Sequence, residues 1–151
     1  MQFEATVEWQ RQGQDFLGQR YSRAHQWRFD GGLALPASSS PLSVPLPMSD
    51  PAAVDPEEAL VAAASSCHML FFLSIAAKRG HTVDSYRDRA LGVLEKDAAG
   101  KMAMTRITLR PEIVFAGMAW PGQEELAQIH HEAHEKCYVA NSLKTEIVVA
   151  M

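Results

Sequence analysis

Two cysteines are the residues of this chain with the most distinctive chemistry. Cys67 lies in an apolar segment, directly after Ser65 and Ser66, and Cys137 lies far downstream at the end of HHEAHEKC. In a cytoplasmic protein, two thiols are more often reactive, metal-binding or merely buried than joined in a structural disulfide. Inert packing is the most frequent role of a buried cysteine. A pair at the ends of two different elements nevertheless suits a catalytic thiol and a resolving thiol.

The two serines before Cys67 indicate a break or restart in the surrounding helix. Serine is poor in a helix interior and good at a helix start. A thiol in a first helical turn has its pKa lowered by the helix dipole. This pattern predicts that Cys67 is the nucleophile.

An inward-facing arginine is the candidate cation beside that thiol. Strand alternation over residues 16–29 places Arg23 and His25 on the aromatic face, together with Tyr21, Trp27 and Phe29. A buried guanidinium must find an anionic partner. Arg20 and Arg28 are the other candidates on the same segment.

A metal site is the competing interpretation of the second thiol. His130, His134 and Cys137 stand at i, i+4 and i+7 on one helical face, and two imidazoles with a thiolate are ligands that zinc prefers. The fourth ligand would have to come from a distant segment.

The order of predicted elements is β-β-α-β-β-α-β, which indicates one α+β domain over residues 1–151. The predicted strands cover residues 3–10, 16–29, 83–95, 102–115 and 143–149, and the predicted helices cover 55–80 and 123–137. The Pro- and Ser-rich segment 33–54 is predicted to be a long loop, with a short edge strand at 42–46.

The helix at 55–80 has start and stop signals at both ends. Asp55 and Glu58 predict a capping box around Pro56, and Gly80 predicts the end of the helix. Between them the segment is apolar almost all round, which is typical of a helix that is buried on every side. One small sheet cannot cover such a helix, so we expect a second subunit to complete its burial.

Composition excludes several classes of function. The 151 residues carry a formal net charge of −4 and no cluster of basic residues, which argues against nucleic-acid binding. The first residues lack the basic and apolar regions of a signal peptide. Polar residues interrupt the longest apolar run and charges flank it closely, so we expect no membrane span and a cytoplasmic protein.

Three segments together resemble the OsmC/Ohr family of thiol-dependent hydroperoxide reductases. DPEEALVAAASSCHMLFFL resembles the family's segment around the reactive cysteine, and HEKCYVANSLKTEI resembles the segment around its second cysteine. YSRAHQWRFDGG is similar to the early strand of one branch.

The resemblance implies an OsmC-like ββαββαβ fold in an intertwined homodimer, with two central helices between antiparallel sheets and active sites at the subunit interface. It implies that Cys67 is the peroxidatic thiol, that Cys137 is the resolving thiol, and that Glu57 is the carboxylate that binds an arginine. The expected substrates are organic and possibly inorganic hydroperoxides, and the expected reductant is a dithiol or dihydrolipoyl partner, with no cofactor. A non-catalytic small-molecule binding protein of the same fold is the alternative.

The arginine departs from the family pattern, because the segment before the helix contains no basic residue. Arg23 is the choice that strand alternation favours, Arg20 is the second, and His68 and His134 would replace part of the charge. Glu57 precedes Cys67 by ten residues, a rise of about 15 Å along a straight helix. We therefore expect a kink near Ser65, rather than a bridging arginine or a Glu57 that serves the partner's site.

Overall fold

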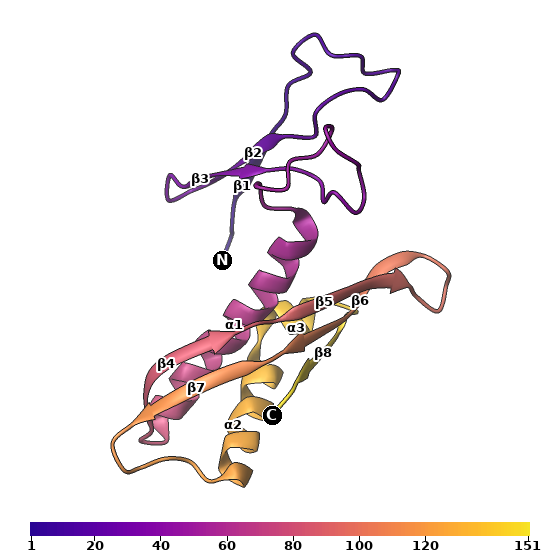
Figure 1. The fold of residues 1–151 in the computed structure, drawn as a ribbon. Coiled ribbons are helices and arrows are strands. Elements are labelled where there is room, and N and C mark those ends of the chain that lie inside the picture. Colours follow the sequence, from indigo (N-terminus) through magenta and orange to yellow (C-terminus); the bar gives the residue numbers. More distant parts are fainter. The chain divides into compact units, whose positions relative to one another are not determined.

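Strands and helices follow one another along the chain in the order β-β-β-α-β-β-β-β-α-α-β (Figure 1). The computed structural model describes all residues from 1 to 151. The elements are β1 (Ala5–Glu8), β2 (His25–Phe29), β3 (Ala34–Ala37), α1 (Pro56–Lys78), β4 (Thr82–Asp88), β5 (Leu91–Lys96), β6 (Met102–Leu109), β7 (Pro111–Ala116), α2 (Gln123–Lys136), α3 (Tyr138–Ser142) and β8 (Glu146–Val149). The predicted α+β class is confirmed. The chain divides into two compact units, Met1–Ala59 and Leu60–Met151, and each is described by itself.

The N-terminal unit is built on the antiparallel sheet β1-β2-β3. The predicted alternation holds from His25 to Arg28, because His25 and Trp27 are partly buried whereas Gln26 and Arg28 are exposed. Phe29, which was predicted to face inward, is exposed. The strand begins only at His25, however, so the predicted strand over residues 16–29 is wrong in its first half.

A tight turn takes the place of that first half. The Asp15 carboxylate accepts a hydrogen bond from the Gly18 N–H at 2.9 Å and forms an ion pair with Arg20. A Cβ on Gly18 would collide with this carboxylate, and Gln19 adopts a φ of 59°. The polar side chains therefore close a turn where alternation alone indicates a strand.

The segment between β3 and α1 is tied to the sheet by main-chain hydrogen bonds. The Met48 carbonyl accepts from the Arg23 N–H at 2.8 Å, and the Val54 carbonyl accepts from the Ser38 N–H at 3.0 Å. The predicted edge strand at 42–46 is instead part of a turn, in which the Ser40 carbonyl accepts from the Ser43 and Val44 N–H groups. The strand of this region is β3, immediately after the Asp30–Gly32 turn.

The ends of α1 are those that its capping residues predict. The Glu58 N–H donates to the Asp55 carboxylate at 2.7 Å, and the Asp55 N–H donates back to the Glu58 carboxylate at 3.4 Å. At the other end Gly80 has a φ of 84°, and the His81 N–H donates to the Ala76 carbonyl at 2.9 Å. This is the Schellman arrangement that satisfies the last carbonyls of a helix.

The predicted break near Ser65 is absent, because α1 continues through both serines. The Ser65 hydroxyl donates to the Asp88 carboxylate at 2.5 Å, and Asp88 also accepts from the Arg110 N–H at 2.6 Å. Ser65 therefore fastens the middle of α1 to the bend between β4 and β5. Since Cys67 lies in the middle of a continuous helix, the first-turn dipole effect predicted for it does not operate.

The predicted hairpin at 83–95 and 102–115 exists, but each of its long strands is divided in two. β4 pairs with β7 and β5 pairs with β6, both antiparallel, and β8 adds to β6 in parallel. One division falls before Pro111, which has no N–H for the ladder. The other falls after Asp88, whose carboxylate bonds to the Arg110 N–H instead.

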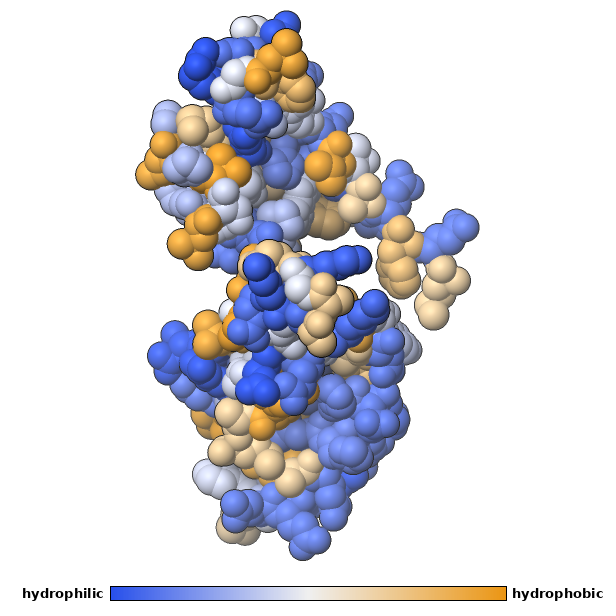
Figure 2. Space-filling model, turned by 90° about the vertical axis from the view of Figure 1, so that its right-hand side faces the viewer, coloured by the Kyte–Doolittle hydropathy of each residue, from blue (hydrophilic) through white to orange (hydrophobic).

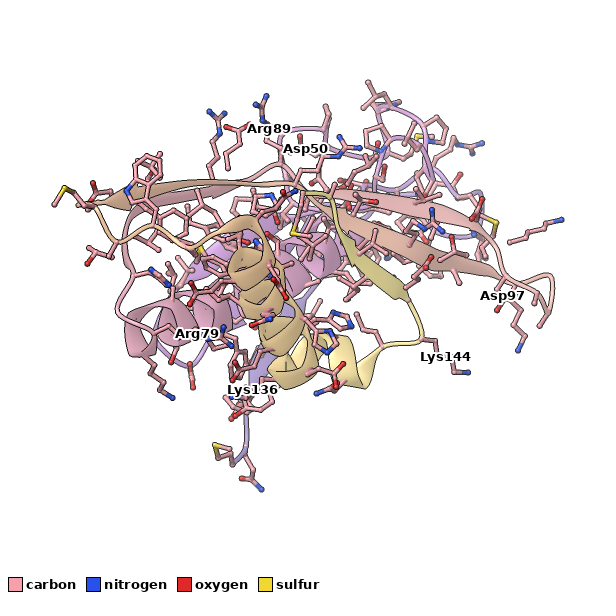
Figure 3. All side chains as sticks on the ribbon, turned by 90° about the horizontal axis from the view of Figure 1, so that it is seen from below. Asp50, Arg79, Arg89, Asp97, Lys136 and Lys144 are labelled. Atoms are coloured by element: carbon pink, nitrogen blue, oxygen red, sulfur yellow. The ribbon has the colours of Figure 1, made fainter.

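The helices α1 and α2 lie on the same side of this hairpin and pack together against it (Figures 1 and 3). Phe72 and Ile75 of α1 pack with Ile129 of α2 against β4 and β7. A second cluster joins Ala64 to β6 and β8. The approach is close at Gly92 of β5, where a Cβ would lie 2.6 Å from Val61. Each fully buried Phe or Ile contributes about 1.5–3 kcal/mol to stability.

Within the chain, only one face of α1 is covered. The buried residues recur at helical spacing: Ala64, His68, Phe72, Ile75 and Ala76. On the opposite face Leu70 is 61% exposed. The length and composition of α1 would also fit a membrane span, but many core helices of soluble proteins have the same length and composition. Elsewhere, hydrophobic residues reach the surface in separate patches among hydrophilic ones (Figure 2).

Candidate functional site

The structure brings the two cysteines together. Cys67 is half-buried on α1, and Cys137 is fully buried at the junction of α2 and α3. Both are free thiols, and Cys67 lies close enough to Cys137 to raise the pKa of its thiol. Two thiols from distant parts of the sequence therefore lie close together, and only that of Cys67 is accessible to solvent.

The geometry of the helix junction sets the environment of Cys137. The residue leaves the helical conformation, with ψ at 110°, and its sulfur accepts a hydrogen bond from the Ala140 N–H at 3.4 Å. Burial, together with the neighbouring Cys67, raises the pKa of the Cys137 thiol to about 11. At neutral pH Cys137 is therefore a protonated thiol that lies close to Cys67.

A pair of buried histidines joins the same two helices beside the thiols. His68 Nε2 lies 3.0 Å from His130 Nδ1, and the two rings are nearly parallel with centroids 5.3 Å apart. Both residues are almost completely buried, at 1% and 4% exposure. The pKa of each is lowered to about 4, mainly by burial and, for His68, also by the neighbouring His130. The pair is neutral at pH 7, so one imidazole donates and the other accepts.

Buried polar groups continue around this pair. His68 Nδ1 and the Tyr86 hydroxyl are buried and have no hydrogen-bond partner. Burial raises the pKa of Tyr86, and the carboxylate of Asp88 is close enough to act on Tyr86, His68 and His130. Burial therefore opposes the acquisition of positive charge by this cluster, and the Asp88 carboxylate offsets part of that effect for both histidines.

Arg23 and Glu57, which both belong to the N-terminal unit, form no ion pair or hydrogen bond with each other. The Arg23 guanidinium donates to the Gln19 and Tyr21 carbonyls and to the Gln19 side chain, and it lies 3.7 Å from the Tyr21 ring centroid. The contact predicted between Arg23 and Glu57 is thus not made. Because α1 is continuous, the kink predicted to bring Glu57 toward Cys67 is also absent.

The alternative zinc site is not formed. No three side chains of the metal-ligating types are placed to share an ion. His130, the first of the three predicted ligands, is turned toward His68 instead. The sequence pattern places His130, His134 and Cys137 on one helical face. The group that α1 presents to His130 is the imidazole of His68.

Two features of the site were not predicted from the sequence, namely the His68–His130 pair and the hydrogen bond from Ser65 to Asp88. His68 is recognisable in retrospect, because it occupies the i+4 row of buried α1 residues with Ala64 and Phe72. Asp88 lies between two exposed arginines and resembles a solvated charge cluster. Nothing in the local sequence indicates that its carboxylate turns toward α1.

Comparison with known proteins relates this architecture to one family. The family model described as OsmC-like protein matches residues 49–151. An OsmC-like protein of unknown function from Vibrio cholerae has a similar structure, with 51% identity, a TM-score of 0.97, and coverage of 99% of this chain and 98% of that one. No curated protein sequence matches the chain.

More distant structures share the fold alone. An organic hydroperoxide resistance protein from Legionella pneumophila is 15% identical with a TM-score of 0.70, and the alignment covers 100% of this chain and 98% of that one. An organic hydroperoxide resistance protein from Bacillus subtilis is 14% identical with a TM-score of 0.65, over 99% and 98% of the two chains.

Proposed function

Because the chain belongs to the OsmC-like family, we propose that it is a thiol-dependent peroxidase that reduces organic hydroperoxides. The observation that carries this proposal is the proximity of a half-buried Cys67 and a buried Cys137. Solved structures of the same fold that are named organic hydroperoxide resistance proteins support it.

The reaction begins at Cys67, the more accessible of the two sulfurs. Its thiolate attacks the outer oxygen of the hydroperoxide, the O–O bond breaks, and the alkoxide leaves and takes up a proton to become an alcohol. Cys67 is then a sulfenic acid. The reaction consumes the two electrons of the sulfur lone pair and requires no cofactor.

Cys137 completes the cycle from its buried position. Its sulfur attacks the Cys67 sulfenic sulfur, the S–O bond breaks, and the hydroxyl leaves as water with the proton that Cys137 carries. The product is a Cys67–Cys137 disulfide, which an external dithiol of the dihydrolipoyl type reduces by thiol–disulfide exchange. Such a reductant, and two thiols that are free at rest, suit a cytoplasmic protein.

Titration of the thiols with cumene hydroperoxide tests this function directly. One equivalent is expected to remove both free thiols rapidly, and dithiothreitol is expected to restore both. The measurement is a thiol count before and after oxidation, with mass spectrometry of the unreduced protein to detect the loss of two hydrogens. A slow reaction, or none, would contradict the peroxidase and support the non-catalytic binding protein.

Arg23 is proposed as the cation that assists Cys67, with its guanidinium oriented by Gln19 and the Tyr21 carbonyl rather than by Glu57. An arginine remains charged when desolvated and can donate to a thiolate and a carboxylate at once. In the Arg23→Met protein, the pH profile of Cys67 alkylation should move upward by about one unit, or roughly 1.4 kcal/mol. Arg20→Met is the matched control. A shift in the control alone would transfer the role to Arg20, and no shift in either would remove both from the mechanism.

We also propose that the protein is a homodimer in which the uncovered face of α1 is buried. The exposed Leu70 and the near absence of charge between Glu58 and Lys78 support this. Light scattering at micromolar concentration should give twice the chain mass of 16.7 kDa. The Leu70→Glu protein should shift toward monomer, and a wild-type protein that is monomeric under these conditions would contradict the proposal.

A further inference from the structure

A buried histidine, His81, follows directly on the C-terminal end of α1, and the proposed thiol chemistry makes no use of it. The residue is 9% exposed. Its main-chain N–H donates to the Ala76 carbonyl at 2.9 Å, after the chain has turned at Gly80 with a φ of 84°. The C-terminal cap of α1 therefore fixes the position from which the His81 ring projects.

Both ring nitrogens of His81 face oxygen atoms of other elements. Nδ1 lies 2.6 Å from the carbonyl oxygen of Ala119, in the loop between β7 and α2. Nε2 lies 3.0 Å from a carboxylate oxygen of Glu125, in the first turn of α2. Nε2 has no well-aligned hydrogen bond, so Glu125 acts on it mainly through charge. The imidazole thus connects the end of α1 to this loop and to the start of α2.

This arrangement fits the doubly protonated imidazolium form of His81. A carbonyl and a carboxylate can only accept hydrogens, and a neutral imidazole carries only one. In either neutral tautomer, the lone pair of one nitrogen would therefore face the oxygen of Ala119 or of Glu125 at close range. With both nitrogens protonated, the ring donates to the carbonyl and attracts the carboxylate. The observed positions thus favour the charged ring.

The charged groups around the ring agree with this assignment. The pKa of His81 is raised, first by the hydrogen bond to the loop carbonyl and then by Glu125, whereas desolvation and Arg79 act in the opposite direction. Arg79 is itself paired with Glu132, at 3.0 Å. The ring of Phe115 on β7, with its centroid 6.3 Å from that of His81, adds no charge. Glu125 is therefore the carboxylate that faces His81 directly.

The loop 117–122 has few other attachments, and it lies at the end of this unit where α1 ends (Figure 1). Met118 is fully exposed, and Trp120 is 64% exposed. The Trp120 indole N–H donates to the Gly117 carbonyl, within the loop itself. The bond from His81 to Ala119 is the only hydrogen bond that joins residues 118–121 to another element. Segments with so few buried contacts open readily.

From this geometry we infer that His81 is a pH-sensitive latch, which holds the loop 117–122 when its ring is protonated and releases the loop when the ring becomes neutral. Loss of the proton replaces an attraction with a lone pair that faces an oxygen. Because the held loop favours the imidazolium, the latch is closed below about pH 6.5, the ordinary histidine pKa, and opens as the pH rises through the raised pKa of His81. The inference goes beyond the proposed peroxidase, because it involves neither thiol.

An NMR titration of the whole chain between about pH 6 and pH 9, which spans the ordinary range of histidine titration, tests the inference. The ring nitrogen shifts report the charge of His81, and the ¹⁵N relaxation of the amides of residues 118–120 reports the mobility of the loop. Both should change with one midpoint above pH 6.5, and the loop should be more mobile on the alkaline side.

Replacement of the facing carboxylate separates the latch from a general effect of pH. In Glu125→Gln, the midpoints of the ring and of the loop should move downward together. Glu124→Gln removes the charge of the preceding, exposed residue and is the matched control, with both midpoints unchanged. In His81→Gln, the loop should be mobile at every pH.

Three results would overturn the inference. The first is a His81 ring that stays neutral throughout the titration, and the second is a loop whose mobility does not change while His81 titrates. The third is a loop midpoint that is the same in Glu125→Gln as in the wild type. If the His81→Gln protein does not fold, the comparison of Glu125→Gln with Glu124→Gln still decides, because neither change removes a residue of the buried core.

Discussion

Replacing Cys67 by serine is expected to abolish hydroperoxide reduction, whereas the Cys137→Ser protein should consume about one equivalent and then stop. The expected difference arises from the positions of the two thiols. Cys67 is half-buried and accessible, whereas Cys137 is 1% exposed and has a pKa of about 11. At neutral pH, Cys137 is therefore a poor first nucleophile but a suitable proton-carrying partner.

The products of the first turnover distinguish the two roles. Without Cys137, Cys67 should accumulate as a sulfenic acid, or continue to sulfinic acid in excess peroxide. Mass spectrometry after one equivalent of cumene hydroperoxide should show the addition of one oxygen in Cys137→Ser and no change in Cys67→Ser. If Cys67→Ser reacted and Cys137→Ser did not, the roles would have to be exchanged.

The helix that carries Cys67 shows how much of this site can be predicted from the sequence. Its ends follow from local rules, because Asp55, Glu58 and Gly80 act through hydrogen bonds to neighbours in the sequence. The interpretation of Ser65 failed because its partner, Asp88, lies on another element. Propensity describes an isolated helix, and a tertiary hydrogen bond offsets the small intrinsic cost of a serine in the interior.

The charged and imidazole residues were harder to place for a similar reason. Alternation placed Arg23 on the inner side of a strand, but the strand begins only at His25, and Arg23 lies partly buried in the loop before it. The Gln19 side chain and two carbonyls are the acceptors, because the Asp15 turn brings them around the guanidinium. Helical spacing likewise grouped His130 with Cys137, but only the packing of α1 on α2 shows that His130 faces His68.

The buried histidine pair is expected to make the folded protein markedly less stable in mild acid. His68 and His130 have a pKa of about 4 in the folded protein, whereas 6.5 is the ordinary pKa of a histidine in an unfolded chain. Between these values the unfolded state binds more protons, so stability falls as the pH falls through this interval. From pH 7 to pH 5 the loss is about 2 kcal/mol for each imidazole.

Other titrating groups act outside this interval or in the opposite direction. The lowered pKa values of Glu112, caused first by its hydrogen bond to Arg89, and of Glu132, caused first by Lys136, reduce stability only at lower pH. His81 has a raised pKa, because it bonds to the Ala119 carbonyl and to Glu125. Its stabilisation is complete below pH 6.5 and is lost as the pH rises, so it opposes the effect only near neutrality.

Guanidinium chloride unfolding at pH 7 and pH 5 measures the effect of the pair. The wild type should lose several kcal/mol, whereas the His68→Leu/His130→Leu protein should lose much less because no buried imidazole remains to be protonated. His131→Gln changes an exposed histidine of the same helix and should behave as the wild type does. If the double variant does not fold, NMR titration of the wild-type imidazoles provides the same test. Protonation of either buried ring above pH 6 in the folded protein would contradict this account of the pair.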